Sequence, residues 1–231
     1  MVAPMQARRA VPLALAVVLA AGLLVVRCLG SPAGLWIGDC LLPRAELEAA
    51  EAELAVAFAQ EGEATRRWHL LEFGMGPAAL LHHALPDASA AALEEAEPWA
   101  ERLEEAEDRM QMVRDWRAAA GLMPDEAYYV QPNPAALGSR VAAAVAPLDR
   151  GGIAGPLRTA EGWEIVLLAG RSDGVRNRAN VLVYRMVFPV GDATDRERAR
   201  SDWGKLPLSG DPDLLDALPL EFRRDRVTDP Q

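Results

Sequence analysis

Residues 148–171, with the sequence LDRGGIAGPLRTAEGWEIVLLAGR, decide the fold of this chain. Gly151 and Gly152 favour the end of a helix, because glycine adopts the left-handed conformation at little cost. Gly155–Pro156 is typical of a turn. Glu164–Leu168 is short and mostly apolar, which predicts a buried strand. An ordinary helix–loop–strand unit would explain each of these residues locally.

The spacing of several positions in this stretch resembles the closing segment of parvulin-type peptidyl-prolyl isomerase domains. In that family a helix ends in Leu-x-x-Gly, a loop carries small-x-Pro-apolar-x-Thr, and Gly-aromatic-His-Ile-apolar leads into the last strand. Glu164 stands where the family usually has histidine. The positions that match the family's spacing are Leu148, Gly151, Ile153, Pro156, Thr159, Gly162, Trp163, Ile165 and Val166.

A second stretch, Val183–Phe188 followed by Asp195–Arg200, is similar to the first strand and the next helix of tandem parvulin domains. Arg185 takes the place of the family's first histidine. Residues 181–188 alternate with apolar side chains on both faces, which predicts a central strand. The family's Gly-Gly-Asp-Leu-Gly loop is absent, so either the domain is rearranged and incomplete or this second similarity is due to chance.

The resemblance implies a small mixed domain over residues 125–203 whose function is to bind polypeptides. It implies a substrate groove, and it leaves no catalytic residue, metal ligand or cofactor to assign. Glu164 and Arg185 are expected to form an ion pair on neighbouring strands in place of two histidines, so isomerase activity is expected to be low or lost. The residues implied for the groove are Thr159, Trp163, Met186 and Phe188.

The amino-terminal part of the chain carries a membrane signal. Arg8 and Arg9 precede Ala10–Val26, which has no charged residue and is followed by Arg27. This length fits the lower limit of a membrane span and the upper limit of a signal-peptide core. We expect an uncleaved anchor, with a signal peptide as the alternative. The charge distribution then predicts a single-pass inner-membrane protein with the bulk of the chain in the periplasm.

The charge of the chain is uneven. Residues 31–130 have a net charge of −13, whereas residues 131–231 are neutral. Acidic character argues against nucleic-acid binding, which depends on clustered Lys and Arg. Apolar residues recur at helical spacing in residues 43–60 and again after residue 88, so an acidic helical region is expected over residues 31–124. Helices and strands segregate along the sequence, and an irregular tail is expected over residues 204–231.

The predicted fold class is therefore α+β: a transmembrane helix within residues 1–30, a helical region, and a small parvulin-like domain. The predicted function is that of a membrane-anchored folding factor, a chaperone outside the cytoplasm that binds unfolded or partner polypeptides. Two alternatives remain open, namely an active peptidyl-prolyl isomerase and an accessory subunit of a larger membrane protein complex.

Overall fold

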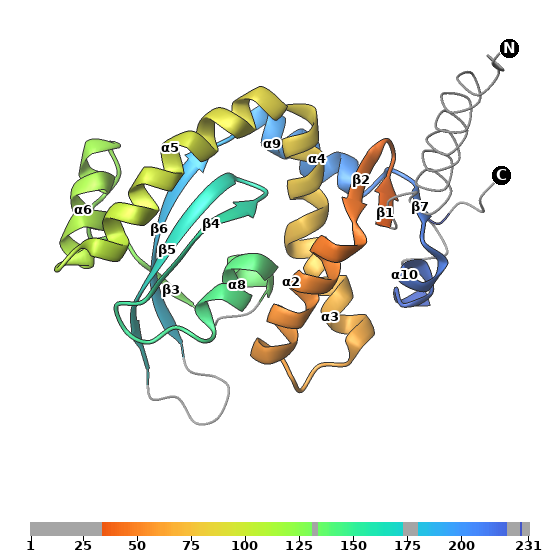
Figure 1. Ribbon diagram of the computed structural model, residues 1–231, viewed down its shortest axis with the longest axis horizontal. Coiled ribbons are helices and arrows are strands. Elements are labelled where there is room, and N and C mark those ends of the chain that lie inside the picture. The colour runs from red at the N-terminus through yellow and green to blue at the C-terminus, as the bar shows by residue number, and fades with distance from the viewer. Residues whose placement is uncertain (1–33, 131–133, 173–179, 221–226, 228–231) are drawn as a thin grey trace, which may run out of the picture. The chain divides into compact units, whose positions relative to one another are not determined.

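The computed structural model describes residues 34–130, 134–172 and 180–220 together with residue 227, and Figure 1 shows the elements that they form. Two antiparallel sheets organise these residues, one with the strand order β3–β6–β5–β4 and a smaller one with the order β2–β1–β7. The strands of the larger sheet are β3 (Tyr128–Val130), β4 (Ile153–Thr159), β5 (Gly162–Arg171) and β6 (Val181–Pro189). Those of the smaller sheet are β1 (Gly34–Ile37), β2 (Cys40–Pro43) and β7 (Leu208–Gly210).

The central strand of the larger sheet is β6, which lies between β3 and β5. Tyr184, Met186 and Phe188 belong to one buried cluster, and Val181 and Val183 belong to another. Successive side chains of a strand point to opposite faces, so β6 has a core on each side. The prediction of a central strand with these two sets of residues is confirmed.

Helices cover both faces of the larger sheet. α5 (Pro86–Glu105) and α6 (Arg109–Ala119) pack on one face, and α8 (Ser139–Val145) packs on the other. α5 ends at Glu105, because the backbone of Ala106 is extended, and Asp108 caps α6 by accepting a hydrogen bond of 2.9 Å from the amide of Gln111.

Four consecutive helical segments connect the smaller sheet to α5, and three further helices complete the described part of the chain. The four are α2 (Arg44–Ala57), α3 (Glu63–Leu70), a π-helical turn η1 (Leu71–Met75) and α4 (Gly76–Ala84). The others are α7 (Pro134–Leu137), α9 (Ala193–Trp203) and α10 (Pro212–Asp216). α9 begins at Ala193, and its N-cap residue Asp192 forms a capping box with Asp195.

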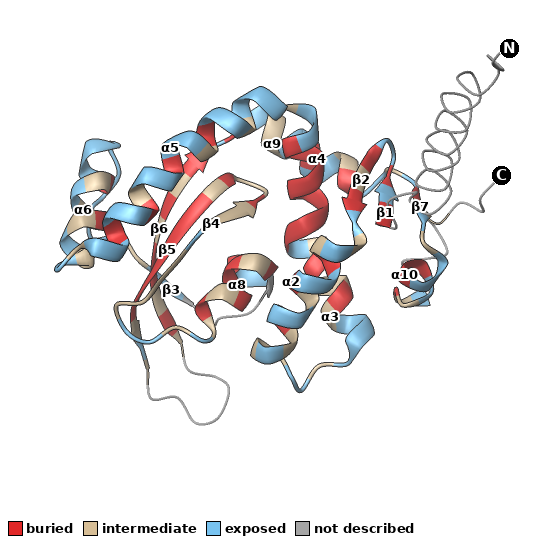
Figure 2. Ribbon diagram, in the orientation of Figure 1, coloured by how far each residue is buried: buried red, intermediate tan, exposed pale blue. Residues whose placement is uncertain are grey.

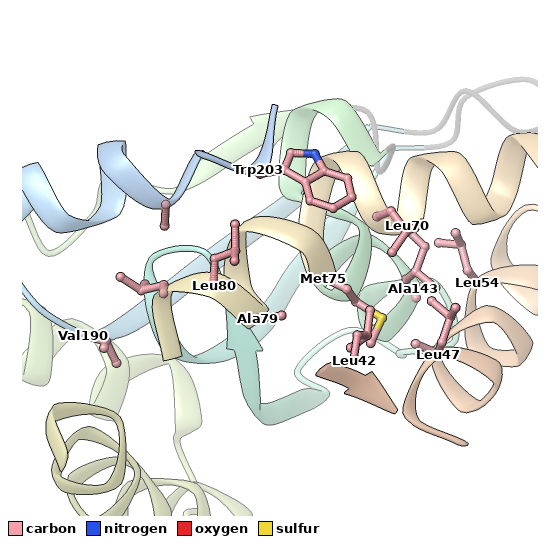
Figure 3. Close-up of a cluster of buried hydrophobic side chains, with 14 of the residues drawn as sticks. Leu42, Leu47, Leu54, Leu70, Met75, Ala79, Leu80, Ala143, Val190 and Trp203 are labelled. Atoms are coloured by element: carbon pink, nitrogen blue, oxygen red, sulfur yellow. The ribbon is translucent and has the colours of Figure 1, made fainter. Parts of the chain in front are cut away.

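One buried cluster joins the helices before residue 124 to the larger sheet. It contains Leu54 of α2 and Leu70 of α3 together with Ala143 of α8 and Val190 after β6. Figure 3 shows these residues with Trp203 of α9 beside α4, and Figure 2 shows that α4 is buried along most of its length. The described residues from Gly34 onward belong to one compact unit. We therefore expect this part of the chain to fold without residues 1–33.

The predicted fold class is correct in its α+β content and wrong in its transmembrane helix. None of the helices in the described ranges combines the length and the apolar composition that a membrane crossing requires. α5 has 20 residues but carries acidic side chains along its length, and its apolar residues form a single buried face. The segment predicted to span the membrane, residues 10–26, lies outside the described residues.

Candidate functional site

Glu164 of β5 and Arg185 of β6 form an ion pair on the face of the larger sheet that α8 covers. Nε of Arg185 donates a hydrogen bond to Oε2 of Glu164 and Nη2 donates one to Oε1, each 2.6 Å long. In the strand register Glu164 lies opposite Val187 and Arg185 lies opposite Val166, so the two charged side chains are diagonal neighbours. The prediction that these strands pair and that these side chains meet is confirmed.

Hydrogen bonds compensate for the burial of the Glu164 carboxylate. The Glu164 side chain is 0% exposed and that of Arg185 is 15% exposed. Oγ1 of Thr159 donates a further hydrogen bond of 2.6 Å to Oε1 of Glu164. Burial favours the neutral form of Arg185, but the hydrogen bonds and the charge of Glu164 outweigh it and raise the pKa of Arg185. The hydrogen bonds from Arg185 and Thr159 give the buried Glu164 side chain the partners that a buried polar group needs.

A pocket of about 380 Å³ lies next to this ion pair. Residues from five parts of the chain line it: η1 and the start of α4, the junction of α7 and α8, the turn between β4 and β5, the ion pair itself, and α9. Besides Glu164 and Arg185, the lining residues are Glu72, Phe73, Gly74, Pro77, Ala135, Ala136, Leu137, Gly138, Arg140, Val141, Thr159, Ala160, Glu161, Arg200 and Trp203.

The π-helical turn η1 brings its residues to the pocket by close packing. A Cβ atom at Gly74 would lie 2.1 Å from Oγ of Ser139, so only glycine allows η1 to approach α8 this closely. Oγ of Ser139 donates a hydrogen bond of 3.0 Å to the carbonyl oxygen of Leu70. Nε1 of Trp203 donates one of 2.8 Å to Oε2 of Glu72. These contacts fix η1 against α8 and α9.

The structure does not bring the four predicted groove residues together. Thr159 lines the pocket beside Glu164, whereas Met186 and Phe188 are each 1% exposed and lie on the opposite face of the sheet. Trp163 lies opposite Phe188 in the strand register and packs on that same face. Alternation along β5 and β6 explains this separation, because residues of odd and even number point to opposite faces.

Trp163 contacts α5 and the buried side chain of His82. Its Nε1 donates a hydrogen bond of 3.0 Å to the carbonyl oxygen of Ser89 in α5, and its ring lies edge-on to the imidazole of His82 at 5.3 Å. His82 is 5% exposed, and its Nε2 donates to the carbonyl oxygen of Thr159 at 3.1 Å. Burial and the positive charge of Arg158 lower the pKa of His82 to about 4. His82 is therefore a neutral, buried link between α4 and the β4–β5 turn.

Several lining residues were not predicted, Phe73 and Glu72 among them. They lie in a segment whose sequence shows only an apolar run broken by Gly74, Gly76 and Pro77. Those glycines were the available signal. Glycine in a helical pattern indicates a close approach of another part of the chain, and a Cβ atom at Gly76 would lie 2.5 Å from the ring of Trp203.

Comparison of the chain with protein-family models, with curated proteins and with solved structures finds no match.

Proposed function

We propose that this protein is a parvulin-like folding factor that binds polypeptide segments in the pocket beside Glu164 and Arg185 and has little or no isomerase activity. One observation carries the proposal. The two positions at which the sequence resembles the histidine sites of parvulin domains lie on adjacent antiparallel strands, and their side chains meet on one face. Along the chain, the strand that resembles the family's first strand follows the closing strand instead of preceding it.

The chemistry of the ion pair supports binding without turnover. The barrier to rotation about a peptide bond is ~18–20 kcal/mol, and an isomerase must favour the twisted amide. In parvulin domains two facing histidines are thought to take part in this. Here Arg185 and Thr159 donate hydrogen bonds to the buried carboxylate of Glu164. This carboxylate therefore has a structural role and is not free to act on a substrate.

The lining of the pocket supports a polypeptide as the ligand. Phe73, Leu137, Val141 and Trp203 contribute apolar side chains to the lining, and Thr159 and six charged residues contribute its polar atoms. The charged lining residues are Glu72, Arg140, Glu161, Glu164, Arg185 and Arg200. Concave sites with mostly apolar walls and a few fixed polar groups are typical of ligand-binding sites in proteins. The uncharged residues 10–26 favour a location outside the cytoplasm, where unfolded chains need folding factors.

The proposal is tested on a chain that begins at Gly34. We expect it to suppress the aggregation of a chemically denatured client protein and to leave the isomerisation of an X-Pro peptide at its uncatalysed rate, with an active parvulin as the positive control. Ala135→Trp, at an exposed residue of the pocket lining, should remove the suppression. Val56→Trp is the matched control, because Val56 is 78% exposed and lies outside the pocket.

Three results would count against the proposal. Robust isomerase activity that Glu164→Ala abolishes would identify an active enzyme instead. Equal suppression of aggregation by the Ala135→Trp and Val56→Trp variants would place client binding elsewhere on the molecule. If the full-length chain, extracted with detergent, elutes with a stoichiometric protein partner and suppresses no aggregation, an accessory subunit of a complex is the better description.

A further inference from the structure

We infer that Phe73 determines the specificity of this pocket, and that the polypeptide bound there inserts an uncharged, apolar side chain against the Phe73 ring. The inference rests on the proposed function, because it concerns the same pocket and the same class of ligand. The inference goes beyond that function in two ways. Phe73 lies outside the stretches that resemble parvulin domains, and the inference states which side chains the pocket binds.

The first support is the position of Phe73. Its side chain is 37% exposed, although its neighbours Leu71, Gly74 and Met75 are all buried. Its backbone angles are φ −99° and ψ 18°, which are not helical and lie in the sparsely occupied bridge region. A π-helical turn changes the direction of the side chains that it carries, and such turns are frequent at functional sites.

The second support is that the turn is held rigidly where it meets the pocket. Gly74 packs directly on Ser139 at the start of α8, and Glu72 accepts a hydrogen bond from Trp203. Phe73 lies between these two fixed residues, its ring packs on the imidazole of His69 at a centroid distance of 5.7 Å, and the rest of the ring faces solvent. An exposed aromatic ring on a rigid support loses little conformational entropy when a ligand packs on it.

The third support is the pairing of charges around the pocket. Arg140 pairs with Glu53 at 3.3 Å, and Arg200 pairs with Glu161. Glu164 and Arg185 pair with each other. A charged side chain that entered the pocket would lose its hydration and find these groups already paired, whereas an apolar one would lose nothing.

The fourth support concerns the backbone of the bound segment. Nε and Nη2 of Arg185 donate to Glu164, but among the described residues none accepts a hydrogen bond from Nη1. Arg185 also lines the pocket. Its guanidinium lies over the ring of Tyr128 at 5.3 Å. Because a guanidinium donates in several directions, Arg185 can offer a donor to a carbonyl oxygen of an extended segment in this pocket.

The test uses three fluorescein-labelled peptides of neutral, polar sequence that differ only at the central residue, which is Leu, Ala or Glu. Binding to the chain from Gly34 onward is measured by fluorescence anisotropy. We expect the Leu peptide to bind best, and Phe73→Ala to weaken its binding about tenfold, as the loss of a buried aromatic contact would do. Binding of the Ala peptide should change little. Phe73→Leu, which keeps an apolar wall, should preserve the preference.

Tyr129→Ala is the matched control, because Tyr129 is an aromatic residue that is 61% exposed and lies outside the pocket. It should leave the binding of all three peptides unchanged. If wild-type protein binds the Glu peptide as well as the Leu peptide, or if Phe73→Ala weakens neither the binding nor the preference, the inference is overturned. If the protein binds none of the peptides and also fails to suppress the aggregation of the client protein, the proposed function itself is wrong. That outcome differs from one in which the client is bound but Phe73 does not set the preference.

Discussion

Arg185 holds the carboxylate of Glu164 with two hydrogen bonds of 2.6 Å across adjacent strands, yet the two residues differ in exposure. The Glu164 side chain is fully buried, whereas 15% of the Arg185 side chain remains exposed at the pocket. Removal of one partner therefore has a different effect from removal of the other. A carboxylate left alone would have no solvent to stabilise it, but a guanidinium left alone would retain some hydration.

Single substitutions at this pair should destabilise the protein more than the double substitution does. We expect Arg185→Met to lower the free energy of unfolding by ~3–5 kcal/mol, because it leaves a buried, unpaired charge. Glu164→Met should cost less, because Arg185 is partly exposed. The double variant should be more stable than either single variant, because apolar side chains of similar volume replace both charges. Urea denaturation of the four proteins measures the coupling between the residues.

If the losses in the free energy of unfolding of the two single variants add up to that of the double variant, the two side chains do not stabilise each other. Leu182 lies on the same strand as Arg185, is also partly buried and pairs with Gly170 in the register, so Leu182→Ala serves as a control for loss of packing in β6 away from Glu164. Its cost should be the same with Met at position 164 as with Glu.

His82 should make the protein less stable as the pH falls from about 6.5 to about 4. Burial, with a contribution from the charge of Arg158, lowers the pKa of His82 to about 4 in the folded protein. The unfolded chain has the ordinary pKa of about 6.5 and so binds the proton first. The contribution of His82 is then complete above pH 6.5 and is lost as the pH falls through this window. The loss should be on the order of 3 kcal/mol.

His82→Gln isolates this contribution, because glutamine can still hydrogen-bond but does not titrate. Urea denaturation at several pH values between 7 and 4 should give a shallower loss of stability for the variant than for the wild type. Other carboxylates titrate in both proteins, so the difference between the two curves is the relevant quantity. Parallel curves would show that His82 does not keep its lowered pKa.

The strands of the larger sheet were the part of the fold that the sequence predicted best. The apolar alternation of residues 181–188 indicated β6 and its central position, and the positions of Glu164 and Arg185 indicated their pairing. The alternation can be read from a single sequence, whereas the expected pairing of Glu164 with Arg185 came from the resemblance to parvulin domains.

The sequence did not indicate features that depend on distant contacts. β1 and β2 are short, and β1 pairs with β7 from the other end of the chain. Gly155–Pro156 was expected in a turn but lies inside β4, where the register shifts between Ala154 and Leu157. The pocket was missed for the same reason, because Phe73 and the ion pair come to line one pocket only through the packing of η1 on α8. Met186 and Phe188 were assigned to a groove although alternation puts them on the opposite face from Arg185.

Gly74→Ala should destabilise the protein through a clash with a single side chain. The added Cβ atom would lie 2.1 Å from Oγ of Ser139, so α8 or η1 must move. We expect a cost of about 1–3 kcal/mol, the usual range for overpacking. Ser139→Gly in the same chain should recover much of that cost, although it gives up the hydrogen bond to Leu70. Thermal unfolding of the two single variants and the double variant measures how much stability is regained. If the double variant is no more stable than Gly74→Ala, the added Cβ atom clashes with another part of the protein.

Trp163→Phe should lower stability and leave polypeptide binding unchanged. The substitution removes the hydrogen bond from Nε1 to the carbonyl oxygen of Ser89 and part of the contact with His82, at a cost of about 1–2 kcal/mol. Trp163 packs on the face of the sheet opposite the pocket, so the anisotropy curves of the Leu peptide should superimpose on those of the wild type. Phe73→Ala should give the converse result for binding, which should weaken, and its cost in stability should come from the lost ring contact with His69. If Trp163→Phe weakens the binding and leaves the unfolding curve unchanged, the groove implied by the sequence resemblance is the true binding site.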